Sequence, residues 1–231
     1  MVVRTWSATA AGLWSAAANW SGGVLPATGD DVVFDGTSVF NCNVDVVVGS
    51  GGAMLSVMIA AAYTGVLTVT VDQTTTNGWG ATTLAGGQIA GSIGTYNALV
   101  NCTSYTQSSG QFGSGSGGLV KSSGALAITG GTWNATEIWE TASADCNINI
   151  TIQVFGLLIQ TVTNSVIYTL LSDLNLSSRL SISGTSTLSG TLAVSTHTVS
   201  CPTITIGIGA PTSYNGIVTV TTGTITGTSS I

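Results

Sequence analysis

Two carboxylates three residues apart are the first candidates for chemistry in this sequence. Glu137 and Glu140 stand close to Trp133 and Trp139 in the segment TWNATEIWE, residues 132–140. Glycoside hydrolysis uses two carboxyl groups roughly 5 to 10 Å apart, and indole rings beside carboxylates can hold a sugar ring. In a helical turn the two glutamates would share one face, whereas a β-strand would separate them. We keep two interpretations, a glycan site and Trp side chains that pack on the fold or at a subunit interface, and favour the second.

A second acidic group lies near the N-terminus and consists of Asp30, Asp31 and Asp35. Clustered carboxylates are ligands that Ca²⁺ prefers, so a calcium site is one interpretation. Asp side chains also cap backbone amides and form turns next to a strand. We favour this structural role, and we expect no metal and no other cofactor.

The remaining reactive side chains do not form a catalytic pattern. Lys121, Arg179 and His197 are isolated from one another in the sequence, whereas lyase chemistry needs a cation beside the substrate and a base of matched pKa. The sequence has no G-x-S-x-G motif and no Gly-rich phosphate loop that ends in Lys. We therefore expect a protein that is not an enzyme.

The four cysteines are far apart in the chain. Cys42, Cys102, Cys146 and Cys201 are separated by 60, 44 and 55 residues, with no C-x-x-C spacing. This spacing argues against a zinc site. Four cysteines allow three disulfide pairings, and we favour instead free thiols that pack as small apolar side chains.

The charge content excludes several classes of partner. The 231 residues include only 3 Lys and Arg against 9 Asp and Glu, and the net charge is −6. Nucleic acids and anionic membrane surfaces both require basic residues that this chain lacks. The most apolar stretch, residues 150–171, contains Gln and Asn, which argues for buried strands rather than a membrane-spanning helix. No secretory signal is recognised at the N-terminus.

Apolar residues alternate with Ser and Thr over many short segments, among them residues 65–73, 124–133 and 216–227. This period is typical of half-buried β-strands. Asn-Gly and Asp-Gly pairs are few, which disfavours a sandwich or barrel built from tight hairpins. We predict an all-β fold, a single-stranded right-handed parallel β-helix (β-solenoid) with coils of roughly 20 residues. In this prediction residues 1–40 form an N-terminal capping segment rich in Trp and Gly, and residues 41–231 form the solenoid body.

The opening of the chain has a recognisable form. A Trp is followed by G-x-W-x-x-x-x-N-W-S-G-G and then by P-x-x-G-D-D-V-V-F-D, all within about the first 36 residues. This pattern resembles the start of many bacterial and phage β-solenoid proteins, including phage virion proteins and autotransporter-like passengers. The resemblance implies the fold more strongly than a function. The matching positions are Trp6, Gly12, Trp14, Asn19, Trp20, Ser21, Gly22, Gly23, Pro26, Gly29, Asp30, Asp31, Val32, Val33, Phe34 and Asp35.

Together these features predict a structural protein of a bacteriophage virion, in first place a capsid decoration or cement protein on the particle surface. The expected attachment and capping residues are Trp6, Trp14 and Trp20 with the three aspartates. The low charge would leave apolar patches exposed, which predicts a homotrimer bound to the major capsid protein or to a tail component. The alternatives are a tail fibre or spike, or a secreted adhesin at the cell surface, that binds host glycans. We expect neither nucleic acid nor a membrane as partner.

Overall fold

The computed structural model describes residues 2–91, 98–114, 118–135, 137–160, 164–183, 189–206, 215–219 and 224–230. These residues form β-strands and two one-turn 3₁₀ helices, and the strands of each sheet run parallel. The predicted all-β solenoid is therefore confirmed. The chain divides into two compact units, a first unit of residues 1–120 with 130–136, and a second unit of residues 121–129 with 137–231. The predicted boundary near residue 40 lies inside the first unit and stays a prediction.

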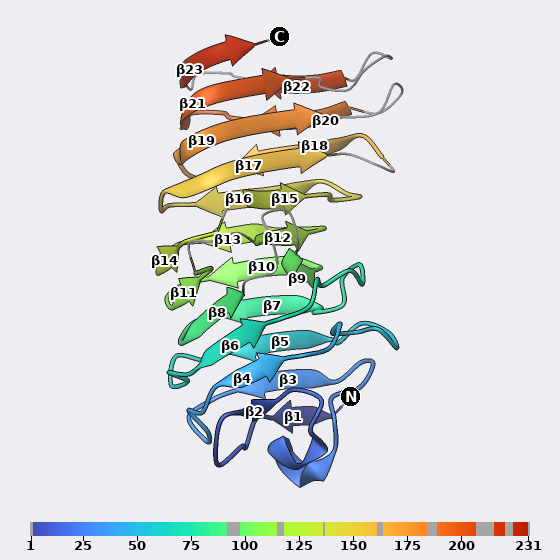
Figure 1. Cartoon of the computed structure of the whole chain (residues 1–231). Helices are drawn as coiled ribbons and strands as arrows, with labels where there is room; N and C mark the ends of the chain where they lie inside the picture. The colour runs from blue at the N-terminus through green and yellow to red at the C-terminus, as the bar shows by residue number, and fades with distance from the viewer. Residues whose placement is uncertain are drawn as a thin grey trace. The chain divides into compact units, whose positions relative to one another are not determined.

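The first unit contains two sheets whose strands stack in chain order (Figure 1). The first sheet contains β1 (Val3–Thr5), β3 (Asp31–Phe34), β5 (Ser56–Ile59), β7 (Ala81–Leu84) and β10 (Ser104–Gln107). The second contains β2 (Gly12–Leu13), β4 (Cys42–Val44), β6 (Val66–Val69), β8 (Gln88–Gly91), β11 (Gln111–Phe112) and β14 (Thr132–Trp133). Strand β9 (Ala98–Cys102) also belongs to this unit.

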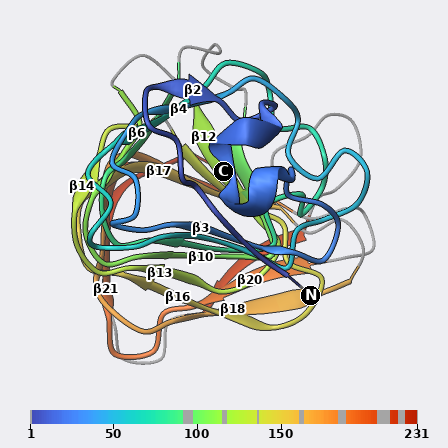
Figure 2. The ribbon, with the colours of Figure 1, turned by 90° about the horizontal axis from the view of Figure 1, so that it is seen from below.

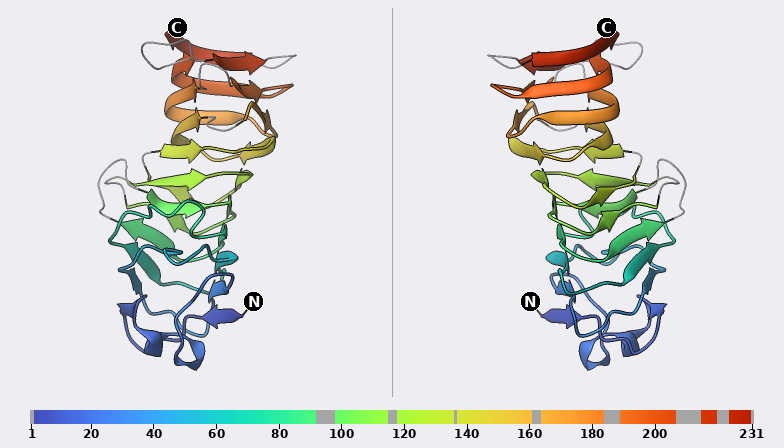
Figure 3. Two further views of the ribbon diagram at one scale, coloured as in Figure 1. Left: turned by 90° about the vertical axis from the view of Figure 1, so that its right-hand side faces the viewer. Right: turned by 90° about the vertical axis from the view of Figure 1, so that its left-hand side faces the viewer.

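The second unit repeats this construction, and Figure 3 shows its strands from two further sides. One sheet contains β13 (Leu126–Ile128), β16 (Cys146–Ile150), β18 (Val166–Leu170), β20 (Ser189–Ala193) and β22 (Asn215–Thr219). The other contains the second half of β12 (Leu119–Ser122), β15 (Glu137–Glu140), β17 (Val154–Gln160), β19 (Leu174–Ser183), β21 (Thr198–Ile206) and β23 (Thr224–Ser230).

The register explains why the sequence alternates without a strict repeat. Paired residues of successive coils lie 19 positions apart at Ile138 and Leu157 but 28 apart at Val3 and Asp31, so the coils are unequal and most are longer than the roughly 20 residues predicted. Along each strand alternate side chains point into the coil. In β3, for example, Val32 and Phe34 are fully buried while Asp31 and Val33 are partly exposed.

The N-terminal segment adds the two 3₁₀ helices, η1 (Ala17–Asn19) and η2 (Ser21–Gly23). They lie at the N-terminal end of the first unit, next to β1 and β2 (Figures 1 and 2). A positive φ of 73° at Gly22 turns the chain within η2, a conformation that glycine adopts without steric cost. The backbones of Trp6 and Trp20 meet here in an isolated antiparallel bridge.

The apolar stretch at residues 150–171 forms strands, as predicted. Its described part contains β17 and β18, with the end of β16 before them. Within the described ranges, no helix has the length and apolar character needed to cross a membrane.

Candidate functional site

The three N-terminal tryptophans form one buried aromatic cluster in the first unit. Trp6, Trp14 and Trp20 are 0%, 3% and 1% exposed. The ring centroids of Trp14 and Trp20 are 4.8 Å apart, and those of Trp6 and Trp20 are 5.2 Å apart, both in edge-to-face contact. Phe34 of β3 packs against all three rings. These side chains therefore stabilise the fold directly, and an attachment role for them stays a prediction.

The indole N–H groups of the cluster bind backbone oxygens. Trp6 Nε1 donates to the Phe40 carbonyl at 3.0 Å, and Trp20 Nε1 donates to the Trp14 carbonyl at 2.7 Å. The Tyr63 hydroxyl donates to the same Phe40 carbonyl at 2.9 Å. Each large ring is thus fixed at its polar end as well as by packing.

The three aspartates serve separate local contacts. Asp30 accepts from Arg4 Nε at 3.2 Å and from the Ala27 amide at 3.1 Å. Burial acts to raise the pKa of Asp30, but the Ala27 amide and the Arg4 guanidinium outweigh it and hold the pKa below its ordinary value. Asp31 accepts from the Ser56 hydroxyl at 2.5 Å, and Asp35 accepts from the Thr37 amide at 2.7 Å.

This arrangement favours capping and turn formation over calcium binding. Three His, Cys, Asp or Glu side chains come together nowhere among the described residues. The four cysteines are free thiols in the structure, and three of them are buried. The fourth, Cys146, is partly buried, and burial together with the nearby carboxylates of Glu140 and Asp145 raises its pKa to about 12.

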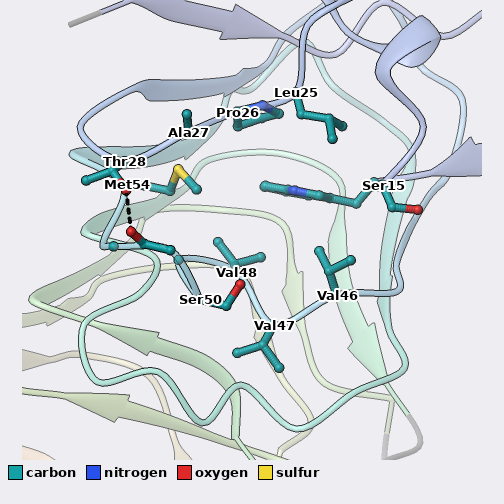
Figure 4. Close-up of a pocket in the computed structure, with 14 residues that line it drawn as sticks. Ser15, Leu25, Pro26, Ala27, Thr28, Val46, Val47, Val48, Ser50 and Met54 are labelled. Carbon is teal, nitrogen blue, oxygen red and sulfur yellow. Dashed lines mark hydrogen bonds between the residues drawn. The ribbon is translucent and has the colours of Figure 1, made fainter.

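Next to the aromatic cluster lies a pocket of about 270 Å³ with an uncharged lining. Figure 4 shows Leu25 and Pro26 on one side of this pocket, Val46 and Val48 on the other, and Met54 at one end. Trp14 completes the apolar wall, and Ser15, Thr28 and Ser50 add hydroxyl-bearing side chains to the lining. An uncharged ring or apolar side chain fits such a lining better than an ion does.

The loop of residues 46–52 that lines this pocket is held by Gln73. The Gln73 amide is 1% exposed and makes four hydrogen bonds. Its Oε1 accepts from the Val48 amide at 2.9 Å and from Trp79 Nε1 at 3.0 Å, and its Nε2 donates to the carbonyls of Val46 and Val71. Neither this pocket nor Gln73 was predicted. The only sequence signal is the run VVVGSGG, which interrupts the apolar and polar alternation.

In the second unit, β15 separates the two candidate glutamates. Alternation places Glu137 and Trp139 on one face and Ile138 and Glu140 on the other. Glu137 Oε2 accepts from Trp139 Nε1 at 3.0 Å, and Glu137 Oε1 accepts from Arg179 Nε at 2.6 Å. The two carboxylates therefore do not form the facing pair that glycoside hydrolysis uses.

A cation also lies on the Trp139 ring. The Lys121 ammonium is 5.0 Å from the ring centroid, a separation at which the ring quadrupole attracts it. We define Lys121, Glu137, Trp139 and Arg179 as the β15 cluster. It combines the one Lys and one of the two Arg of the sequence with an indole and a carboxylate.

A glycine lies between the two partners of the ion pair in this cluster. Gly156 of β17 pairs in register with Arg179 of β19. A Cβ atom at Gly156 would lie 3.5 Å from Arg179 Cγ and 3.6 Å from Glu137 Cγ. Arg179 thus reaches Glu137 across β17 at a position where the central strand has no side chain.

Trp133, the fourth residue of the predicted glycan or interface group, belongs to the first unit. Its ring stacks on Phe112 with centroids 4.8 Å apart and planes 17° apart. Tyr105 contacts it edge-on at 6.4 Å. Within its own unit, Trp133 therefore packs against other aromatic side chains of the fold, as the second interpretation of the sequence describes.

Comparisons with protein-family models, with curated proteins and with solved structures found no match. The resemblance of the opening segment to phage and bacterial β-solenoid proteins therefore stays a prediction. The candidate sites of this chain are the uncharged pocket beside the aromatic cluster and the β15 cluster.

Proposed function

We propose that this chain is a structural protein of a bacteriophage particle, displayed on its surface as a capsid decoration protein. The observation that carries the proposal is the distribution of exposed apolar side chains. Among the described residues, nine of the twelve exposed large hydrophobic side chains lie within residues 2–58. These nine side chains belong to the first coils of the first unit, and exposed apolar groups that form a contiguous patch are typical of surfaces that bind another protein.

The attachment surface in this proposal is the exposed part of the N-terminal region and not its buried tryptophans. Its members are Val2, Val3, Leu13, Val24, Leu25, Val39, Phe40, Leu55 and Met58. The proposed partners are two further copies of this chain and the major capsid protein. A solenoid suits this role because neighbouring coils bury one another and leave the outward faces of the sheets free for display.

Quantitative mass spectrometry of purified particles of the source phage tests this proposal. Hundreds of copies per particle are expected for a decoration protein, because only a shell lattice repeats a binding site so often. A few to a few dozen copies would replace the proposal by a tail fibre or spike. Absence from particles would contradict a virion role altogether.

The β15 cluster favours a second candidate, a fibre or adhesin that binds host glycans. Trp139 is partly exposed, and it shares the Glu137 carboxylate with Arg179, whose side chain is 45% exposed. An indole face and a guanidinium together suit a saccharide that carries an acidic group. Binding on a glycan array should be lost in Trp139→Leu and kept in the control Ile167→Ala, which changes an exposed side chain outside the cluster. Equal binding by both variants would contradict this candidate.

A further inference from the structure

The interior of the second unit contains a carboxyl group without an opposite charge. Glu140 ends β15 and is 0% exposed, on the same inward face as Ile138. Neither of its two carboxyl oxygens has a hydrogen-bond partner of normal geometry. Buried polar groups are almost always paired, so an unpaired buried carboxyl requires an explanation.

The groups around Glu140 are polar but uncharged or acidic. Cys146 of β16 and Tyr168 of β18 are paired in register, and both lie near enough to Glu140 for its charge to raise their pKa values. The fully buried Tyr168 hydroxyl also lacks a partner. Ser122 of β12 directs its hydroxyl to the Gly124 carbonyl and also lies near enough to Glu140 to lower its pKa. The next carboxylate along the chain, Asp145, accepts a hydrogen bond from the Ile167 amide at 2.8 Å.

The basic side chains described in the second unit lie elsewhere. Lys121 and Arg179 belong to the β15 cluster, on the opposite face of β15 from Glu140. His197 lies 3.7 Å from the exposed carboxylate of Asp173. A charged Glu140 would therefore be buried without a counter-ion, which costs far more free energy than burial of the neutral acid.

We propose that Glu140 is a protonated carboxylic acid inside the folded second unit at neutral pH, and that its ionisation links the stability of this unit to pH. The neutral acid can donate its proton to a neighbouring oxygen, and the Tyr168 hydroxyl is the unpaired group beside it. Loss of the proton to solvent would leave a bare carboxylate in the coil interior. The contribution of Glu140 to the stability of the second unit is therefore largest in acid and is lost as the solution becomes alkaline.

The electrostatics agree with this geometry. Burial raises the pKa of Glu140 to about 9, and Ser122 with the backbone of Thr141 and Ala142 only partly offsets this effect. In the unfolded chain the same carboxyl ionises near its ordinary value of 4.5. Between these two values unfolding releases a proton, so this group raises the unfolding equilibrium constant up to tenfold for each pH unit. This destabilising effect is absent below pH 4.5, the ordinary pKa, and stops increasing above about pH 9, the pKa in the folded chain.

Carbon NMR of the wild-type chain tests the protonation state directly. Glu137 and Glu140 are the only glutamates in the sequence, so protein labelled with ¹³C at the Glu side chain gives two carboxyl signals. The variant Glu137→Gln assigns them. We expect the Glu140 signal to keep the chemical shift of the neutral acid at pH 7 and to change near pH 9. A Glu140 signal that titrates near pH 4.5 would overturn the proposal.

Urea unfolding between pH 5 and 8 tests the link to stability. The free energy of unfolding of the wild type should fall as the pH rises. In Glu140→Gln this fall should be smaller by the amount that the release of one proton on unfolding accounts for. Glu137→Gln is the matched control, because it makes the same change three residues away on the opposite face and should keep the dependence. Identical pH dependence in wild type and Glu140→Gln would contradict the proposal. If Glu140→Gln does not fold, the NMR titration of the wild type still decides.

Discussion

Gln73 and Glu140 are both buried polar side chains, but their surroundings differ. Gln73 has four hydrogen bonds, which satisfy its carbonyl oxygen and both amide hydrogens. Glu140 has no hydrogen-bond partner of normal geometry for either carboxyl oxygen. A buried group whose hydrogen bonds are all made holds its neighbours in place. A buried carboxyl group without partners lowers the free energy of unfolding, and by more when it is ionised than when it is protonated. The first group thus gives the first unit a rigid loop, and the second makes the other unit sensitive to pH.

The variant Gln73→Leu should destabilise the first unit by about 2 to 4 kcal/mol. Leucine has a similar volume, but it leaves the Val48 amide, Trp79 Nε1 and two carbonyls without partners. Urea denaturation followed by tryptophan fluorescence measures the loss. Gln153→Leu, at an exposed position, is the control and should change stability by less than about 0.5 kcal/mol. Equal effects of the two variants would show that the hydrogen bonds of Gln73 contribute little.

The sequence predicted strands better than it predicted contacts. Alternation alone identified β17, β18 and the other half-buried strands, because period two reports which side chains point inward. It also stated that a strand would separate Glu137 from Glu140, as β15 does. It could not show that Arg179, 42 residues after Glu137, would pair with it. Such a contact depends on the coil length, which varies along this chain and leaves no periodic signal.

At the scale of elements, the three neighbouring strands β15, β17 and β19 act together to build the β15 cluster. The ion pair between its outer strands passes over Gly156 in the central one. The Arg179 side chain is 45% exposed and that of Glu137 only 5%, so water screens the pair from one side. The stabilisation that this ion pair contributes therefore depends on the side chain at position 156 of β17 as well as on the two charges.

A double-mutant cycle with Glu137→Gln and Arg179→Gln should give a coupling free energy of about 1 kcal/mol. The same cycle in a Gly156→Val background should give a smaller value, because a Cβ atom there already contacts Arg179 Cγ and Glu137 Cγ and the two methyl groups of valine add further bulk between them. Leu158→Val is the matched background, since Leu158 lies on the same strand in register with Trp139 and Ser181 instead. A coupling that survives Gly156→Val unchanged would contradict this role of the glycine.

At the scale of the whole molecule, stability arises from contacts between successive coils. Each inner strand pairs with the strand one coil before and the strand one coil after, and such arrays tolerate the loss of an internal repeat. A sandwich or barrel would lose its core in the same experiment. The unequal coil lengths mean that a deletion must follow the observed register and not a fixed count of residues.

Deletion of residues 148–169 should leave a folded, shorter protein. These 22 residues are one coil in register, since Ile148 pairs with Leu170, and the deletion brings Leu170 into the place of Ile148 with its side chain inward. Circular dichroism should keep the β-sheet spectrum, and urea should still give a cooperative transition. Deletion of only the first eleven of these residues is the control, because half a coil breaks the register and exposes apolar side chains. If both deletions unfold the protein, each coil depends on more than its immediate neighbours; if neither does, the register seen here does not determine stability.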